Sequence, residues 1–271
     1  MMAFLIVVAS STWLTLLLMH FFSLEEAKKN MDELKPKRFR REFEHCNFYE
    51  DDDHHSEWFK RMEPVNRVAP NLGWLSTGKI PASLTLGQPT AFRDLMEYIP
   101  AERNTIKMYG KTSAVPRFEA VFGKDYTFAG KPHKAIVDFP PPIKELLDYA
   151  NSIRSFWTTN PSNPKFNGAV VNFYIDESHY IGAHSDSEKG IQEDSPVFSA
   201  SFGTDRYFKI TSKGNNNTQL QLEQPLVLKL ADRDICVMGG RMQKNFKHEI
   251  LKVRKGDWEG PRINITFRQH I

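Results

Sequence analysis

Hydrophobic and polar positions first follow a helical period. After Thr90, which can cap a helix, apolar residues recur at the i, i+3, i+4, i+7 spacing of a helix face: Phe92, Leu95, Met96 and Ile99. Pro100 ends this segment, because proline lacks the N–H that a helix interior needs. A second helix is predicted from Pro140–Pro142, since proline is tolerated in a first turn, and its apolar face is formed by Ile143, Leu146, Leu147, Ala150 and Ile153.

Beyond Gly168 the pattern changes to short runs rich in Val, Ile, Phe and Tyr. The predicted strands are Val170–Ile175, Val197–Phe202, Tyr207–Thr211, Thr218–Leu222, Pro225–Leu230, Asp234–Met238, His248–Val253 and Arg262–Arg268. Turn-forming residues separate several of them, notably residues 213–217 and the pair Gly239 and Gly240. Many short strands in series predict a sandwich or barrel, so we expect a mainly β fold of the α+β kind.

Residues 1–22 contain no Lys, Arg, Asp or Glu. At about 1.5 Å per residue they are just long enough to cross a hydrocarbon layer of about 30 Å, which predicts a transmembrane or signal-anchor segment. A cleaved secretory signal is disfavoured because no basic residue precedes the apolar run, whereas a start at Met31 would remove the segment altogether. With an anchor here, the basic residues that follow predict that the rest of the chain faces the cytosol or nucleoplasm.

Residues 23–80 are expected to be a linker and N-terminal extension of mixed charge. The most basic part, Lys35–Arg41, holds five basic residues in seven. Such a run is compatible with a nuclear import signal, a polyanion-binding arm or a membrane-surface patch, although a solvated charge run is the commoner explanation. The remaining residues, 81–271, are predicted to form one domain.

Composition excludes few classes of protein or partner. The chain has 271 residues, of which 36 are basic and 33 acidic, and its net charge is +3. This length can bury a core without disulfides, and the mild charge neither requires nor excludes a polyanion partner. Cys46 and Cys236 are the two cysteines and form no CxxC pair, which argues against a cysteine zinc site and fits a reducing compartment.

Three residues in the β-rich half have the types needed to hold a metal ion. His184 and Asp186 are two positions apart, so in an extended segment both side chains point to one face. His248 begins a later predicted strand and can supply a third ligand. Two histidines and one carboxylate form the facial triad of non-haem Fe(II), which leaves positions open for a bidentate co-substrate and O₂. Taken alone, however, the H-x-D pair is explained more simply by a surface hydrogen bond.

The last predicted strand, Arg262–Arg268, alternates without interruption. One face is apolar, as is typical of a core strand: Ile263, Ile265 and Phe267. The other face is polar: Arg262, Asn264, Thr266 and Arg268. Two arginines that bracket an amide and a hydroxyl predict a carboxylate clamp, because guanidinium groups bind carboxylates bidentately and stay charged. A dicarboxylate with a 2-oxo acid end at iron and a distal carboxylate at an arginine would satisfy both motifs.

The ordered set of motifs closely resembles the AlkB-like oxygenases, which depend on Fe(II) and 2-oxoglutarate. The resemblance runs from about residue 84 to the C-terminus, and the closing R-x-N-x-T-x-R motif is its most specific part. Two further strand motifs match, at Asn172–Tyr174 and Ser195–Gly203. Three upstream motifs resemble the nucleotide-recognition lid of the branch that repairs alkylated duplex DNA: Met108–Lys111, Val115–Arg117 and Tyr126–Gly130.

The resemblance implies a role for each matching residue. Iron would be held by His184, Asp186 and His248, and Arg268 would bind the distal carboxylate of 2-oxoglutarate. The rest of the co-substrate pocket would be formed by Asn172, Tyr174, Arg262, Asn264 and Thr266. Phe128 would stack on the extruded base, and Tyr109 would belong to a wedge that fills the gap in the base stack. The other substrate-binding residues would be Arg117, Tyr126 and Glu188.

The resemblance also implies a double-stranded β-helix, or jelly roll, with buttressing helices and a lid at about residues 104–135. The implied reaction is oxidative demethylation of 1-methyladenine or 3-methylcytosine in DNA with Fe(II), 2-oxoglutarate and O₂, which releases formaldehyde, succinate and CO₂. The expected protein is a monomer that acts on alkylated DNA in the nucleus or at a cytosol-facing membrane.

Two departures from the family pattern affect the substrate side. Ser185 stands where many relatives have Arg, and Ser187 stands where related sequences have a second acid. The alternatives are therefore an RNA demethylase or a protein oxygenase on the same scaffold. A non-catalytic binding module is a third alternative, against which the intact triad and clamp argue. The lid aromatics also have a competing explanation as core residues.

Overall fold

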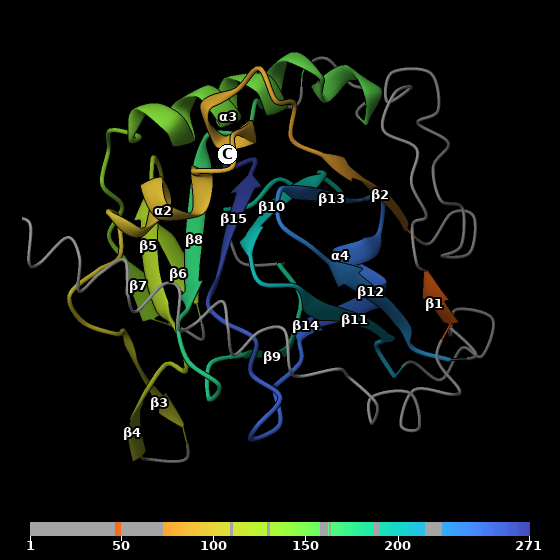
Figure 1. Ribbon diagram of the computed structural model, residues 1–271. Helices are drawn as coiled ribbons and strands as arrows, with labels where there is room; N and C mark the ends of the chain where they lie inside the picture. The colour runs from red at the N-terminus through yellow and green to blue at the C-terminus, as the bar shows by residue number, and fades with distance from the viewer. Residues whose placement is uncertain are drawn as a thin grey trace, which may run out of the picture. The chain divides into compact units, whose positions relative to one another are not determined.

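The structure, a computed structural model, describes residues 47–49, 73–108, 111–128, 131–157, 162, 164–186, 190–214 and 224–271. Within these residues the strands form two large sheets and two hairpins (Figure 1). The predicted membrane segment, residues 1–22, lies outside the described residues. Of the helices that the structure does describe, none combines the length and apolar character needed to span a bilayer.

The six-stranded sheet has the order β2-β13-β10-β15-β8-β5. In that order its strands are Trp74–Lys79, Asp234–Gly239, Val197–Gly203, Arg262–Arg268, Gly168–Tyr174 and Phe118–Phe122. The five-stranded sheet has the order β1-β12-β11-β14-β9, with strands Asn47–Tyr49, Leu226–Leu230, Arg206–Ser212, Phe246–Ile250 and Ile181–His184. One hairpin pairs β3 (Thr105–Met108) with β4 (Lys111–Ala114), and the other pairs β6 (Tyr126–Phe128) with β7 (Lys131–His133).

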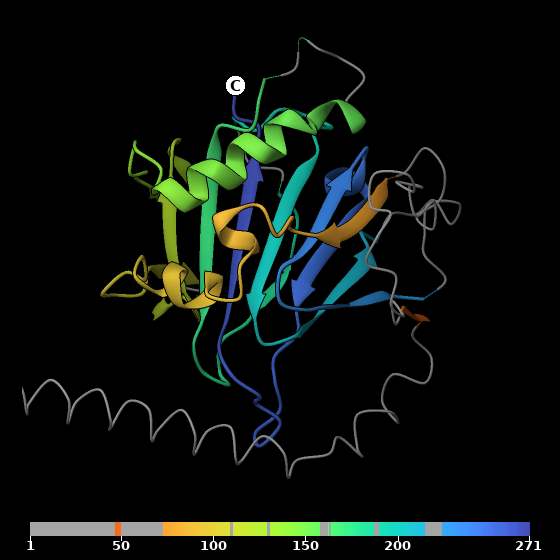
Figure 2. The same ribbon diagram turned by 45° about the horizontal axis from the view of Figure 1, so that its top comes forward.

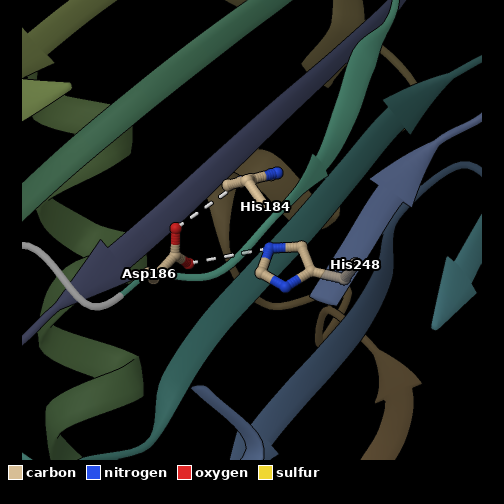
Figure 3. A group of neighbouring side chains, drawn as sticks. All are labelled: His184, Asp186 and His248. Atoms are coloured by element: carbon tan, nitrogen blue, oxygen red, sulfur yellow. Dashed lines mark ion pairs between the residues drawn. The ribbon is translucent and has the colours of Figure 1, made fainter. Parts of the chain in front are cut away.

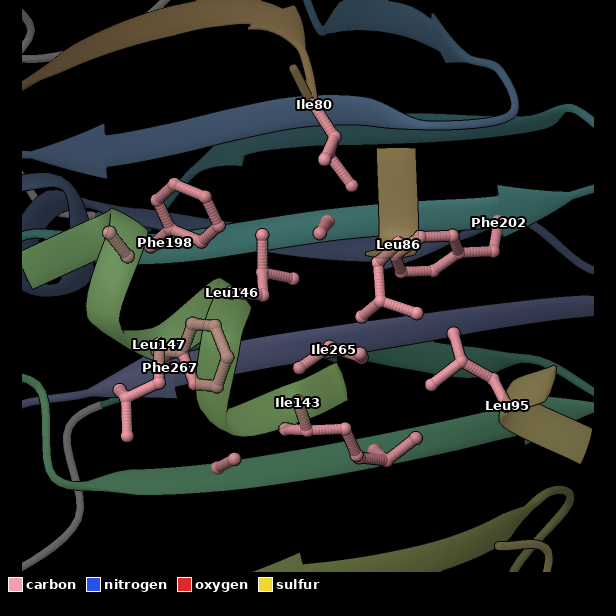
Figure 4. Close-up of a cluster of buried hydrophobic side chains, with 14 of the residues drawn as sticks. Ile80, Leu86, Leu95, Ile143, Leu146, Leu147, Phe198, Phe202, Ile265 and Phe267 are labelled. Atoms are coloured by element: carbon pink, nitrogen blue, oxygen red, sulfur yellow. The ribbon is translucent and has the colours of Figure 1, made fainter. Parts of the chain in front are cut away.

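Two helices cover one face of the six-stranded sheet. Helix α3 (Pro141–Ser152) lies across the strands, and the shorter α2 (Ala91–Met96) packs on the same face (Figure 2). Figure 4 shows how Ile143 and Leu146 of α3 and Leu95 of α2 meet the sheet residues Ile265 and Phe267. Each such buried side chain contributes about 1.5–3 kcal/mol of transfer free energy. The expectation that two helices buttress one sheet is confirmed.

A second core lies between the two sheets. It joins residues of the six-stranded sheet, such as Tyr174 and Met238, to residues of the five-stranded sheet, such as Phe208 and Ile250. The other helical segments within the described residues are short: η2 (Thr85–Gly87), η3 (Arg154–Phe156) and α4 (Met242–Asn245). Two sheets packed face to face, antiparallel except where β1 pairs with β12, confirm the predicted mainly β, jelly-roll fold class.

Strand β15 separates the two cores. All seven of its residues are buried, with Ile263, Ile265 and Phe267 in the helix-side core. Its polar face therefore points into the molecule between the sheets rather than into solvent. The pattern predicted the alternation correctly, and a buried polar face requires polar partners or a ligand.

The predicted strands agree with the observed ones within one or two residues, with two qualifications. The segment predicted as His248–Val253 is observed as Phe246–Ile250, so His248 sits in the middle of β14. Strand Thr218–Leu222 lies outside the described residues. Eight of the described strands were not predicted, namely β1 to β7 and β9. Among them, β9 is short and partly exposed, and β2 is an edge strand.

The structure differs from the sequence-based expectation at Thr90 and at residues 74–79. Thr90 does not cap α2 through its side chain; its hydroxyl instead donates to Asp94 Oδ2 at 2.8 Å, because Thr90 itself has helical backbone angles. Residues 74–79, expected within the N-terminal extension, form β2 and pair with β13. The folded sheet therefore begins before residue 81.

Candidate active site

The three predicted metal ligands converge at one end of the sandwich. His184 ends β9 and His248 lies on β14, where the two residues face each other as antiparallel partners. Asp186 follows β9 by two residues and turns toward both rings (Figure 3). His184 Nε2 lies 3.7 Å from Asp186 Oδ1, and His248 Nε2 lies 3.9 Å from Asp186 Oδ2. One ligand atom from each residue lies within 4.8 Å of the others, so a single metal ion can contact all three.

The charge states at this site suit a divalent cation. Burial lowers the pKa of His184, and burial with the neighbouring His184 lowers the pKa of His248 to about 3, so both rings are neutral at neutral pH. Burial alone would raise the pKa of Asp186, but the charge of Arg268 outweighs it and holds that pKa well below its usual range. Two neutral imidazoles and one ionised carboxylate are the forms in which these ligands bind metal.

Hydrogen bonds around the triad favour metal binding over a purely structural cluster. Nδ1 of His184 donates to the Gly182 carbonyl at 2.9 Å, so the lone pair of the neutral ring lies on Nε2, the atom that faces Asp186. Asp186 is buried, yet its Oδ2 atom accepts no hydrogen bond. A buried, unsatisfied carboxylate oxygen is costly unless a ligand completes it. The residues therefore fit a divalent ion of the Fe(II) class.

Arg262 presents an unpaired cation inside the same cavity. It is 1% exposed, donates from Nη2 to Ser201 Oγ at 2.8 Å, and has no hydrogen-bond partner for Nε or Nη1. Its guanidinium carbon lies 5.4 Å from the centroid of the Tyr174 ring. Burial lowers the pKa of Arg262 to about 10, so the group stays charged at neutral pH. Among the described residues no carboxylate forms an ion pair with it, which suits the binding of an anionic ligand.

Arg268 lines the predicted pocket and contacts one of the three predicted metal ligands. Its Nη2 donates to Asp186 Oδ1 at 2.8 Å, so its guanidinium lies at the metal end of the cavity. Arg262 lies six residues earlier, at the other end of β15, about 20 Å away along the strand at about 3.3 Å per residue. Both arginines line the cavity, and which of them would receive the distal carboxylate of a co-substrate stays a prediction.

The remaining residues of the predicted co-substrate pocket line the same cavity as the triad. Asn264 is held within the sheet, since its amide nitrogen donates to Ser199 Oγ and to the Ala200 carbonyl and its oxygen accepts from Thr266. The cavity is lined from both sheets and includes Asn172, Tyr174, His184, Asp186, His248, Arg262, Asn264, Thr266 and Arg268. These nine predicted residues are thus brought together.

Arg117, predicted to contact substrate, also lines this cavity and is part of a buried network. Its Nε donates to Asn172 Oδ1 at 2.7 Å, and its Nη2 forms an ion pair with Glu119. Glu119 in turn accepts a hydrogen bond from Asn104 at 3.2 Å. Glu119 was not predicted; a charged residue within the apolar run of β5, Phe118–Phe122, is the one sequence feature that marks it.

The structure does not test the predicted roles of the other substrate-binding residues. Tyr109 and Glu188 lie outside the described residues. Tyr126 and Phe128 begin and end β6, whose backbone is paired with β7. Their roles therefore stay predictions from the sequence.

Comparisons with known proteins agree with this geometry. The family model of the 2OG-Fe(II) oxygenase superfamily matches residues 16–268. A protein named DNA oxidative demethylase ALKBH2 from Arabidopsis thaliana is 28% identical over 200 residues, which cover 66% of this chain and 61% of that protein. The human protein of the same name is 29% identical over 181 residues, 64% of each chain. A mouse alpha-ketoglutarate-dependent dioxygenase, alkB homolog 3, is 30% identical over 105 residues, 38% of this chain and 36% of that protein. The chain thus spans less than two thirds of the Arabidopsis and human relatives.

Proposed function

The chain belongs to the 2OG-Fe(II) oxygenase superfamily, and we propose that it is an oxidative demethylase of N-alkylated bases in DNA. The observation that carries this proposal is the single cavity that joins the His184–Asp186–His248 triad to the buried cation of Arg262. A metal site beside an unpaired arginine is what a 2-oxo dicarboxylate needs. The names of the Arabidopsis and human relatives support DNA as the substrate.

The cofactors are Fe(II), 2-oxoglutarate and O₂. The triad would hold the iron, which together with 2-oxoglutarate and O₂ supplies the oxidation of an N-methyl group, releasing formaldehyde, succinate and CO₂. Arg262 would bind the distal carboxylate of 2-oxoglutarate, with the Tyr174 ring against its guanidinium. Arg268 would keep Asp186 ionised and oriented, since the two side chains are hydrogen-bonded and buried. Asn172 and Thr266 would form the remaining walls of the co-substrate pocket.

The substrate is proposed to be 1-methyladenine or 3-methylcytosine. A methyl group on a Watson–Crick nitrogen blocks pairing, so such a base costs less to extrude. Phe128 would stack on the extruded base, Tyr109 would fill the gap it leaves, and Tyr126, Glu188 and Arg117 would contact the base. Arg117 supports this role because it reaches the cavity while remaining tied to Asn172.

The location and organisation of the protein follow from the same reading. We place the enzyme in the nucleus, because its proposed substrate is DNA, and the monomeric state stays a prediction of the sequence. The catalytic domain is proposed to comprise residues 81–271 together with β2, with a lid at about residues 104–135. Membrane attachment through residues 1–22 stays a prediction of the sequence.

Formaldehyde release from methylated oligonucleotides tests the proposal. The full chain is supplied with Fe(II), 2-oxoglutarate and O₂ and offered 1-methyladenine or 3-methylcytosine in duplex DNA, single-stranded DNA and RNA, with unmethylated strands as the control. We expect formaldehyde and succinate in equal amounts from methylated DNA. Turnover confined to RNA, or to a methylated peptide in a parallel reaction, would replace the proposed substrate. The absence of succinate with every substrate would contradict the enzyme assignment.

A further inference from the structure

Asp186 is held in place by contacts that lie outside the metal triad. Its backbone N–H donates to Gln243 Oε1 at 2.8 Å. The hydroxyl of the preceding residue, Ser185, donates to the Phe246 carbonyl at 2.7 Å. Both acceptors belong to the segment that leads directly to His248. Two hydrogen bonds therefore tie the segment that carries His184 and Asp186 to the segment that carries the third ligand, about sixty residues later.

The pairing of β9 with β14 is too short to fix the backbone position of Asp186. Strands β9 and β14 are matched only at His184 with His248 and at Ile181 with Ile250, with an irregularity between the two pairs. Asp186 lies beyond the last of these pairs, so no ladder hydrogen bond fixes its backbone. Without Gln243, the N–H of this buried residue would lose its hydrogen-bond partner, which is costly for a buried donor.

Gln243 is itself rigidly placed. It lies on α4, whose residues Met242 and Asn245 are buried, and the Lys213 ammonium donates to the Gln243 carbonyl at 2.7 Å. The other end of its side-chain amide lies 3.8 Å from Met238 Sδ on β13. The backbone of Gln243 is thus held by Lys213, directly after β11, and its side chain lies against β13. Because these contacts hold Gln243 in place, its side-chain oxygen can fix the position of the Asp186 N–H.

We propose that Gln243, assisted by Ser185, is a positioning residue that holds the carboxylate of Asp186 at the metal-binding geometry. The inference rests on the proposed metal site. It adds the residues that connect the segment carrying His184 and Asp186 to the segment carrying His248. Partners of metal ligands typically change metal affinity by 10–100-fold when they are removed. Gln243 contacts a ligand's backbone and not the metal, so we expect a weaker metal complex rather than a lost one.

Matched variants separate this role from simple stability. Gln243→Met keeps a side chain of similar length but replaces the amide oxygen with a thioether, which is only a weak acceptor for the Asp186 N–H. Gln243→Glu keeps an acceptor oxygen at the same position. Lys244→Met alters the neighbouring residue of α4, which is exposed, and serves as the control. Ser185→Ala and Ser185→Thr form a second pair, in which the threonine retains the hydroxyl.

The experiment is calorimetric titration of Mn(II) into the full metal-free chain, with no 2-oxoglutarate present. We expect Gln243→Met to weaken Mn(II) binding roughly 10–100-fold, Ser185→Ala to weaken it less, and Gln243→Glu, Ser185→Thr and Lys244→Met to stay close to wild type. Melting temperatures of the metal-free variants are measured in parallel, because a merely structural role predicts a lower melting temperature and unchanged affinity.

The Asp186→Asn variant distinguishes the failure of this inference from failure of the metal site. If Asp186→Asn abolishes Mn(II) binding while Gln243→Met binds like wild type, the positioning role is overturned and the triad stands. If Asp186→Asn binds Mn(II) as tightly as wild type, the triad itself is wrong and the positioning role fails with it.

Discussion

The sandwich and the hairpins in front of it are built in different ways. In the sandwich, every residue of β8 and β15 is buried, and the polar side chains between the sheets are held by hydrogen bonds to neighbouring strands. In the hairpin of β3 and β4, every residue of β4 is exposed, and the two strands pair only with each other. A rigid interior suits fixed metal and co-substrate geometry, whereas a surface hairpin can meet a large substrate without disturbing it.

This difference suggests a division of labour. In the proposed function, the triad and Arg262 would determine the oxidative chemistry, and residues 104–135 would determine which base reaches it. Arg117 and Glu119 stand at the boundary, because β5 pairs with β8 while Asn104, just before β3, donates to Glu119. Substitutions in the two regions should therefore have separable effects on co-substrate turnover and on DNA demethylation.

The largest effect is expected at Asp186. Asp186→Asn keeps the size of the side chain but removes the charge that a divalent ion requires, so metal binding and turnover should be lost on every substrate. Formaldehyde release and Mn(II) titration measure this, and circular dichroism checks the fold. Asp148→Ala, an exposed carboxylate of α3, is the control that should change nothing. Normal turnover by Asp186→Asn would place the chemistry elsewhere.

A smaller effect is expected at the arginine clamp. Arg262→Lys replaces a planar fork with a point charge and should raise the 2-oxoglutarate concentration needed for half-maximal rate by roughly tenfold or more, since hydrogen bonds to charged groups are worth about 1.5–3 kcal/mol. Arg268→Lys should mainly weaken metal binding, because this arginine contacts Asp186. Succinate formation against co-substrate concentration separates the two. A larger rise for Arg268→Lys would return the distal carboxylate to that residue.

These expectations show where sequence reasoning succeeds and where it ends. The alternation of Arg262–Arg268 and the residue types of the triad predicted a buried polar strand and a metal site, because period and ligand chemistry are local properties. Which arginine faces the metal depends on where Asp186 comes to lie, and this is a contact between residues 82 positions apart. Gln243 and Glu119 were missed for the same reason, since their roles arise only from partners that are distant in the sequence or lie on other segments.

Tyr109, in the lid region, should show an effect restricted to one substrate. Extruding a base from a duplex costs a few kcal/mol of unstacking energy. If the Tyr109 side chain fills the gap and offsets part of that cost, Tyr109→Ala should lower activity on methylated duplex DNA by roughly tenfold. Activity on methylated single strands should change little, and Mn(II) and 2-oxoglutarate binding should not change. Comparing initial rates on the two DNA forms measures this. An equal loss on both, together with a lower melting temperature, would indicate a core residue instead.

The smallest effect is expected where the two regions meet. Asn104→Ala removes the hydrogen bond to Glu119 and should lower the free energy of unfolding by about 0.5–1.5 kcal/mol, with little change in succinate formation. Urea denaturation measures the change. In a Glu119→Gln background the same substitution should cost less, because its partner is altered. Equal costs in both backgrounds would show that the two residues are not coupled.

Side-by-side assay of succinate and formaldehyde tests the division between sandwich and hairpins most directly. Wild type, Arg262→Met and Tyr109→Ala are each incubated with Fe(II), 2-oxoglutarate and O₂, with and without methylated duplex DNA. We predict that Arg262→Met loses both products, and that Tyr109→Ala keeps the succinate formed without DNA while losing most of the formaldehyde from the duplex. Parallel loss of both products in Tyr109→Ala, or unchanged succinate in Arg262→Met, would contradict the account.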